Sequence, residues 1–459
     1  MRSLVPKPRL RAMNPARAKS RVRIGAMLLL GASVLTPVRA AAQDAAGDVE
    51  ALQRKVAEQD ARIAELERTV RGLAAANQAP ATRGEAFAAT YRAPVVASPA
   101  SPAAAPPFPA QGVRPATEPS RLSVSGDLRL RQEFNWSDKD ARDRSRTVMR
   151  ARLGARYALD RNVTVGARLV TGDPDDPNTA DVTVGDFVDD LTVSLDRAYV
   201  EARFGDLLLT GGKFALPLRG TELVWDGDFN PEGLGASVSA PLGSRGLKAE
   251  ATALYSIVSE AAGGHGSDML GGQVTLGGRL SPFWSASLTA GYYDYHLSAL
   301  AGADAGDFRS NLRARDGSYL SDFDLLDVIA IARFDGFGVD WPVSATAETV
   351  HNFGAATGAD TGYFAQLSAG STAQAGGLRM SYGYMQAEAD AVFAAFSHDN
   401  IGLATSYRLH QIALDYALRA NTQLNLILYH YRPLASDPAS PGAARDWLDR
   451  LRLNAVFAF

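Results

Sequence analysis

The residues of this sequence best suited to bind solutes are arginines that recur at every second position. Around residues 128–131 and 149–157 they alternate with leucine, alanine, methionine and tyrosine. Side chains alternate between the two faces of a β-strand, so each row of arginines would share one face. Guanidinium groups bind anions, so an unpaired row would attract anions, whereas a row paired with carboxylates would be neutralised. Both interpretations remain open for Arg129, Arg131, Arg150, Arg152, Arg156 and Arg168.

Strands must position these rows, and the C-terminal segment gives the clearest strand pattern. In Trp447–Phe459, the residues at 451, 453, 455, 457 and 459 are Leu, Leu, Ala, Phe and Phe, and those between are mostly more polar. This period of two is typical of a strand with one apolar face. The pattern recurs back to about Ser120, in about sixteen segments. It predicts an all-β fold, a transmembrane antiparallel β-barrel of about sixteen strands over residues 120–459, with Phe459 in an aromatic girdle.

The expected connections between these strands alternate in length. Short ones such as Asp160–Arg161 and Ala420–Asn421 alternate with long ones such as Gly172–Asp190, Leu218–Pro231 and Ala389–Ala404. Outer-membrane barrels have short periplasmic turns and longer external connections. The alternation therefore favours a barrel over a soluble β-sandwich.

In such a barrel, charged faces must point into the lumen, because charge is costly against lipid. We therefore expect Arg129, Arg131, Arg150, Arg152, Arg156, Arg168 and Lys213 to line a pore. The connection Leu218–Pro231 carries Arg219, Glu222, Asp226 and Asp228, and these would set the electric field across the pore if it folds inward. The sequence alone favours an ordinary solvated loop for this segment.

Three further segments precede the predicted barrel. Residues 1–42 have a basic start, an apolar stretch at Ile24–Leu35 and small residues before Gln43, which predicts a secretory signal peptide. Residues 48–73 have heptad spacing with Val or Ile alternating with mainly Leu, which predicts an oligomerising coiled coil. Residues 74–119 are rich in Ala and Pro and predict an extended linker.

Enzymatic and metal-dependent functions find little support in the sequence. There is no cysteine, and the six histidines lack metal-ligand spacing. Neither a nucleophile elbow nor a phosphate-binding loop is present. The aspartates of Gly172–Pro177 fit a solvated acidic loop better than a calcium site. We therefore expect no catalytic residues, no metal and no cofactor.

Several motifs in the first half of the barrel resemble a known family. They are Arg150–Gly154 (RARLG), Asp196–Val200 (DRAYV), Gly211–Phe214 (GGKF) and Arg219–Gly233 (RGTELVWDGDFNPEG). These motifs resemble the "putative porin" family of Gram-negative bacteria, which often carries an N-terminal coiled coil. The resemblance implies a sixteen-stranded, trimeric barrel that passes small solutes by diffusion. It specifies no solute, and the lack of a dense lysine cluster argues against phosphate selectivity.

Together these observations predict an outer-membrane porin for small hydrophilic solutes or ions, with its N-terminal segment in the periplasm. Its expected partners are outer-membrane lipid and two further copies of itself, with no nucleic acid. Contact of residues 48–119 with peptidoglycan would make the chain a structural tether between the membrane and the cell wall, which is the main alternative. A barrel enzyme is a more distant one.

Overall fold

The computed structural model describes residues 121–137, 143–176, 178–185, 190–243, 246–261, 263–298, 308–434 and 446–459. All of them belong to one compact unit, Tyr91–Phe459. The predicted signal peptide (1–42), coiled coil (48–73) and linker (74–119) lie outside the described residues. No helix among the described residues is long and apolar enough to cross a membrane.

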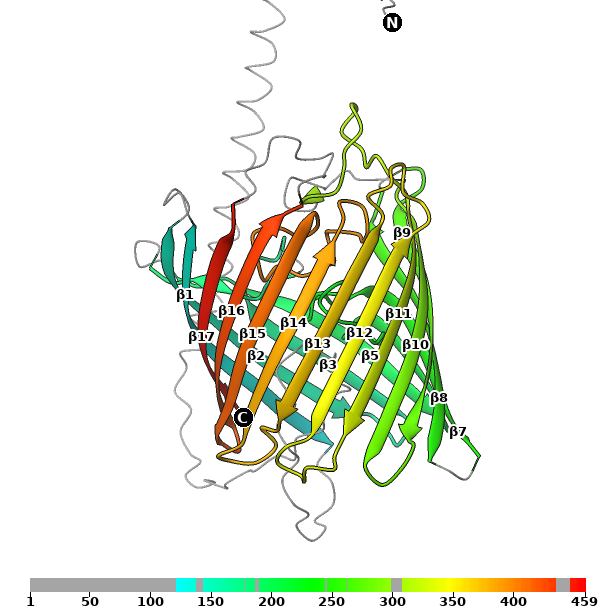
Figure 1. Cartoon of the computed structure of the whole chain (residues 1–459). Helices are drawn as coiled ribbons and strands as arrows, with labels where there is room; N and C mark the ends of the chain where they lie inside the picture. The colour runs from blue at the N-terminus through cyan, green and yellow to red at the C-terminus, as the bar shows by residue number, and fades with distance from the viewer. Residues whose placement is uncertain are drawn as a thin grey trace, which may run out of the picture. The chain divides into compact units, whose positions relative to one another are not determined.

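The described residues form one antiparallel sheet that closes on itself (Figure 1). Each long strand pairs with its neighbours in the chain, and β1 pairs with β17 to close the barrel. The strands are β1 Leu122–Ser137, β2 Arg144–Ala158, β3 Val163–Thr171, β4 Val182–Thr183, β5 Val193–Phe204, β6 Leu207–Lys213, β7 Glu232–Leu242, β8 Leu247–Ser259, β9 Ser267–Arg279, β10 Trp284–His296, β11 Phe323–Phe334, β12 Val343–Asn352, β13 Thr361–Gly370, β14 Leu378–Ala387, β15 Tyr407–Arg419, β16 Thr422–Pro433 and β17 Leu448–Ala458.

The sixteen long strands confirm the predicted fold, and β4 is an addition to it. β4 is a two-residue strand inside the connection between β3 and β5, and it pairs with Val148 and Met149 of β2. It extends the sheet where β3 has already ended, so β3 pairs directly with β5. The closed barrel therefore still has an even number of long strands, as is usual for bacterial outer-membrane proteins.

Along each strand, exposed apolar side chains alternate with side chains turned into the barrel. Leu234, Val193 and Leu270 are among the most exposed apolar residues, at 65%, 59% and 56%. The residues between them point inward, because successive side chains of a strand lie on opposite faces. The outer surface is therefore an apolar band suited to lipid.

The connections fall into two classes at the two ends of the barrel. One end has tight turns such as Gly205–Asp206, where Gly205 adopts a positive φ of 61°. The other end has the long connections 172–192, 214–231, 297–322 and 388–406. This is the alternation expected of periplasmic turns and external connections.

Candidate functional site: a charged wall and two inward-folded connections

The connection between β6 and β7, residues 214–231, folds into the barrel instead of lying in solvent. Leu223, Trp225 and Phe229 are at most 4% exposed. Burial of each such side chain stabilises the fold by roughly 1.5–3 kcal/mol. A loop exposed to solvent would lack this stabilisation. The sequence-based preference for a solvated loop is therefore wrong, because it weighed the charges of this segment and not its apolar residues.

Hydrogen bonds to the wall hold this connection across the lumen. The backbone of Arg219 exchanges two hydrogen bonds with the side chain of Gln273 on β9, at 2.8 and 2.7 Å. The Thr221 hydroxyl donates to Glu348 on β12. Trp225 meets Tyr293 of β10 edge-on, with ring centroids 5.0 Å apart. The connection therefore spans from its own strands to the opposite side of the barrel.

A second connection, residues 388–406 between β14 and β15, also folds inward and packs on the first. Phe396 stacks on Phe229 at 4.1 Å, and the Asp226 amide donates to the Phe396 carbonyl at 2.8 Å. The Asn178 side-chain amide donates to the carbonyls of Ala395 and Ser397. Sequence reasoning treated this segment as an external loop. Its apolar run AVFAAF at 391–396 was a signal against this prediction, because a loop in solvent would not be expected to carry it.

Together the two connections fill the β8–β16 side of the lumen with a dry cluster of apolar side chains. Phe323, Leu325, Val350 and Tyr407 of the wall are all fully buried against it. The other side of the lumen, formed by β1, β2, β3, β5 and β17, carries the rows of paired arginines and is here called the charged wall. Fewer charged groups, such as Asp327 and Glu348, point inward on the apolar side. Side-chain exposure along this wall ranges from 0% at Glu133 to 34% at Arg156.

The six arginines expected to line the pore lie on this charged wall, and each has a carboxylate partner. Arg131 bonds Asp181 at 2.5 Å, and Asp181 also accepts from Arg129. The remaining pairs are Arg150 with Asp127 at 3.0 Å and Asp228 at 3.4 Å, Arg152 with Asp127 at 2.7 Å and Asp228 at 3.2 Å, Arg156 with Glu201 at 2.5 Å, and Arg168 with Asp196. We call these six residues the arginine ladder. The geometry shows that the ladder is paired with carboxylates and is not a row of free cations.

Lys213 does not share the inward face, which corrects its predicted position on the pore wall. It lies opposite Ala198 and Glu232 in the sheet, and Glu232 lies opposite Ile257, which is 41% exposed on the outer face. Its partner is Glu232, at 2.6 Å. Lys213 is the last residue of β6, where the neighbouring Gly212 adopts a φ of +112°. Residue type alone suggested the lumen, but the register of the strands decides the face.

Sequence reasoning missed four arginines of the charged wall. One is Arg146 of β2, which lies opposite Glu133 of β1 and bonds it at 2.8 Å. Arg450 and Arg452 alternate with Leu451 and Leu453 in β17, the same signal that identified the other rows. Arg452 binds Glu133 of β1 at 2.8 Å. Arg197 was hidden because a β-bulge places the adjacent Asp196 and Arg197 on the same face.

The inward connections bring carboxyl groups together beside this wall. Asn400 accepts from Arg452 at 2.7 Å and donates to Glu222 at 2.9 Å, and the Asp399 amide donates to Asp226 at 3.3 Å. Burial, with Asp399 and Asp228 nearby, raises the pKa of Glu222 to about 8. Burial and the neighbouring carboxylates also raise the pKa of Asp226. Burial and mutual repulsion therefore favour the protonated forms of Glu222 and Asp226.

Asp228 behaves in the opposite way. Burial would raise the pKa of its carboxyl, but Arg150 and Arg152 outweigh burial and hold that pKa below its usual range. Arg219, the cation of the same connection, pairs with Glu250 at 2.6 Å. Of the four charged residues predicted for this connection, Asp228 is thus the one that joins it to the arginine ladder as a fixed negative charge.

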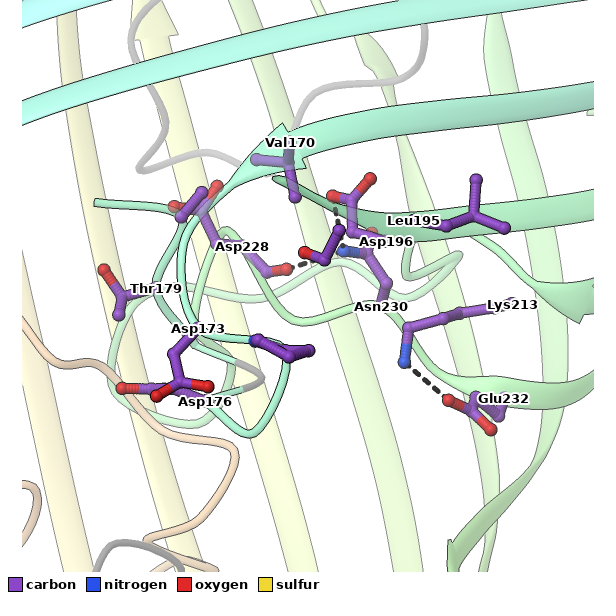
Figure 2. Close-up of a pocket in the computed structure, with 13 residues that line it drawn as sticks. Val170, Asp173, Asp176, Thr179, Leu195, Asp196, Lys213, Asp228, Asn230 and Glu232 are labelled. Atoms are coloured by element: carbon purple, nitrogen blue, oxygen red, sulfur yellow. Dashed lines mark hydrogen bonds and ion pairs between the residues drawn. The ribbon is translucent and has the colours of Figure 1, made fainter. Parts of the chain in front are cut away.

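A cavity of about 250 Å³ lies where the connection leaves the wall, between β3, β5 and β6 (Figure 2). Asp173 and Asp176 lie on one side of it, and the Lys213–Glu232 pair lies on the other. Asp196, Asp228 and Asn230 line it from the lumen. Among the described residues, no group of three or more His, Cys, Asp or Glu side chains is arranged to hold a metal ion.

Comparison with known families bears on the half of the barrel that carries this wall and the first inward connection. Residues 132–302 match the "Putative porin" family. The matched span runs from within β1 to beyond β10, so it includes most of the arginine ladder and all of residues 214–231. It confirms the resemblance stated from the sequence motifs. No curated protein matches this sequence.

Several solved porin structures resemble the chain in fold. OprB of Pseudomonas putida is 12% identical, with a TM-score of 0.49, over 74% of this chain and 94% of that chain. OmpF of Salmonella typhi, in complex with daunomycin, is 13% identical, with a TM-score of 0.45, over 74% and 97%. An anion-selective porin from Comamonas acidovorans is 14% identical, with a TM-score of 0.44, over 74% and 99%.

Proposed function

We propose that this chain is an outer-membrane porin that allows small hydrophilic solutes or ions to diffuse passively through its lumen. The observation that carries the proposal is the connection 214–231, which folds into a closed barrel and meets a charged wall through Asp228. A purely structural barrel has no need of a charged, partly accessible face opposite a folded-in segment. Transport of this kind needs no covalent step, so in this proposal the chain is not an enzyme.

The path for solutes is displaced from the barrel axis towards β1, β2, β3, β5 and β17. The dry cluster occupies the opposite side, while side chains of the charged wall keep partial access to water. Arg152 and Arg156, for example, have side-chain exposures of 22% and 34%. A path beside paired opposite charges would orient dipolar solutes in the local field, which is one way that charged rings control passage.

Pairing of the ladder predicts weak ion selectivity. Every arginine of the ladder contacts a carboxylate, but Arg129 and Arg131 share Asp181. Arg146, Arg450 and Arg452 likewise share Glu133, so the wall keeps only a modest excess of positive charge. In this proposal Arg129, Arg131, Arg150, Arg152, Arg156 and Arg168 position solutes, and Glu222, Asp226 and Asp228 adjust the sign preference. Lys213 and Arg219 pair elsewhere and have no such role.

Planar-bilayer conductance of the refolded full chain across a KCl gradient tests the proposal. We expect steady channels with a small reversal potential. The double variant Arg150→Gln/Arg152→Gln should move the preference towards potassium, whereas Arg161→Gln, in an exposed turn at the far end, should not. A folded, heat-modifiable barrel that never conducts would refute the diffusion function.

We further propose that the barrel is a homotrimer in the outer membrane, with residues 48–73 assembling in the periplasm. The exposed Lys213–Glu232 pair and the adjacent Leu195, 54% exposed, support a protein contact at this part of the outer face. Deletion of residues 48–119 separates this proposal from a role as a cell-wall tether. The shortened chain should still conduct, with fewer trimers in chemical cross-linking. A tether would lose its peptidoglycan association and would not conduct in either form.

A further inference from the structure

The outer face of the barrel carries a cationic and aromatic patch at the upper ends of β14–β17. We call it the cation–ring patch. Tyr407, Leu409, Tyr429 and Tyr431 are at most 5% exposed and point into the barrel, so the residues between them point outward. The patch consists of Tyr382, Tyr384, Arg408, His410, His430, Arg432 and Trp447.

Within the patch, like groups lie directly opposite each other on β15 and β16. Arg408 is paired in register with Arg432, and His410 with His430. Like charges directly opposite in an antiparallel sheet are destabilising. The lumen also has opposed arginines, such as Arg129 and Arg150, but there carboxylates of Asp181, Asp127 and Asp228 pair with them.

The two arginines of the patch lack that compensation. Neither forms an ion pair with a carboxylate among the described residues. Arg408 donates to the Gln386 side chain at 3.2 Å, and Arg432 lies over the Trp447 ring at 4.7 Å. The nearby carboxylate of Asp449 is bonded to His430 at 2.7 Å. The opposed guanidinium groups are therefore positioned to share an anion that no carboxylate of the described residues supplies.

Ring contacts hold the patch in shape. Trp447 stacks on His430 at 4.0 Å with an interplanar angle of 10°, and the Tyr382 hydroxyl lies 2.9 Å from Nδ1 of His410. Stacked rings restrict rotamers, so the cationic groups lose little further freedom when a ligand binds.

The position of the patch identifies the kind of anion. Met380, Ile412 and Leu426, 40–55% exposed, continue the same outward face towards the middle of the barrel. The long connection 388–406 leaves from the same end as the patch (Figure 1). The patch therefore lies at the upper edge of the apolar band, where tyrosine and tryptophan belts meet lipid headgroups.

We propose that the cation–ring patch is a binding site for the phosphate group of a lipid in the outer leaflet, bridged by Arg408 and Arg432. Guanidinium groups bind phosphate through two parallel hydrogen bonds, and the bound charge relieves the repulsion between the two strands. The acyl chains of the same lipid would cover Ile412 and Met380. This site is independent of the solute path inside the lumen.

The test measures binding and thermal unfolding of the refolded full chain with lipid A, a diphosphorylated lipid. The variants are Arg408→Gln/Arg432→Gln, the conservative Arg408→Lys/Arg432→Lys, and the charge-matched control Arg161→Gln/Arg279→Gln at the short-turn end. We expect the Gln double variant to lose at least tenfold in affinity for lipid A, the Lys variant to lose less, and the control to bind normally. Without lipid, the Gln variant should unfold at the same temperature as the wild type or a higher one, because the Arg–Arg repulsion is gone.

Four results would overturn the proposal. The first is unchanged lipid A binding by a folded Gln variant, and the second is equal binding of lipid A and its dephosphorylated form by the wild type. Full competition by inorganic phosphate at concentrations equal to the lipid would show a simple anion site instead of a lipid site. Loss of trimers with unchanged lipid binding would identify the patch as a contact between copies of this chain.

Discussion

Replacing Asp228 by Asn should shift the ion preference of the channel towards chloride. Asp228 is the inward connection's bridge to Arg150 and Arg152, at 3.4 and 3.2 Å. Its low pKa means that the carboxylate is charged under all ordinary conditions. The substitution therefore removes one full negative charge beside the proposed path and leaves two arginines with Asp127 alone.

The size of the shift follows from Coulomb's law. An ion that passes about 5 Å from the removed charge loses or gains ~0.8 kcal/mol in water. Screening by about 0.1 M salt reduces this to ~0.5 kcal/mol. Because the effect has opposite signs for potassium and chloride, their ratio changes by ~1 kcal/mol, which is roughly fivefold. The lower polarity of the lumen would enlarge this value.

Reversal potentials in a KCl gradient measure the effect directly. Asp206→Asn is the matched control, because it removes the same charge from an exposed turn at the other end of the barrel. The reasoning is refuted if Asp228→Asn and Asp206→Asn give the same reversal potential. Heat-modifiable migration of both variants must first show that they are folded.

Three further predictions concern Glu222 and Phe396 of the inward connections and Gly212 of β6. Raising the pH from about 6.5 to 9 should ionise Glu222, whose pKa is about 8, and so increase the preference for potassium. In reversal-potential measurements, Glu222→Gln should abolish this part of the pH response. Because the folded chain raises that pKa from 4.5, the contribution of Glu222 to stability is complete below pH 4.5 and is lost as the pH rises through about 8. The free energy of unfolding in urea should therefore depend less on pH between these values in the Gln variant. Phe396→Ala should remove the stack on Phe229 and weaken the packing of both inward connections by about 3–5 kcal/mol. The looser packing should raise single-channel conductance. An unchanged conductance would argue against a role of these connections as a constriction. Gly212→Ala should impair barrel assembly, because φ is +112° and a Cβ would lie 2.3 Å from the Ala198 carbonyl oxygen; normal yields of heat-modifiable protein would contradict this.

Local sequence information was enough for the barrel itself. The period of two along each strand, the apolar outer positions and the alternating connection lengths are properties of short segments, and lipid imposes them on every strand separately. This is why Leu451, Leu453 and Phe457 identified both the strand and its lipid-facing side. The same logic placed the arginine rows opposite to the leucines, on the inward face.

The partners of those arginines could not be read from the sequence. Asp181 and Asp228 lie 50 to 78 residues away from the side chains that they bind. Such pairs exist only after the barrel has closed and two connections have turned inward. Likewise, the face of Lys213 depends on strand register, and the face of Arg197 depends on a bulge, neither of which changes the local composition.

The sequence by itself therefore determined that this chain forms a lipid-facing barrel with charge on its inner surface. Only the tertiary structure decided that this charge is paired, that residues 214–231 and 388–406 fill one side of the lumen, and that Arg408 and Arg432 are left facing each other outside. The physical reason is range: alternation is enforced residue by residue by the surrounding lipid and water, whereas electrostatic pairing is set by contacts between segments that meet only in the closed barrel.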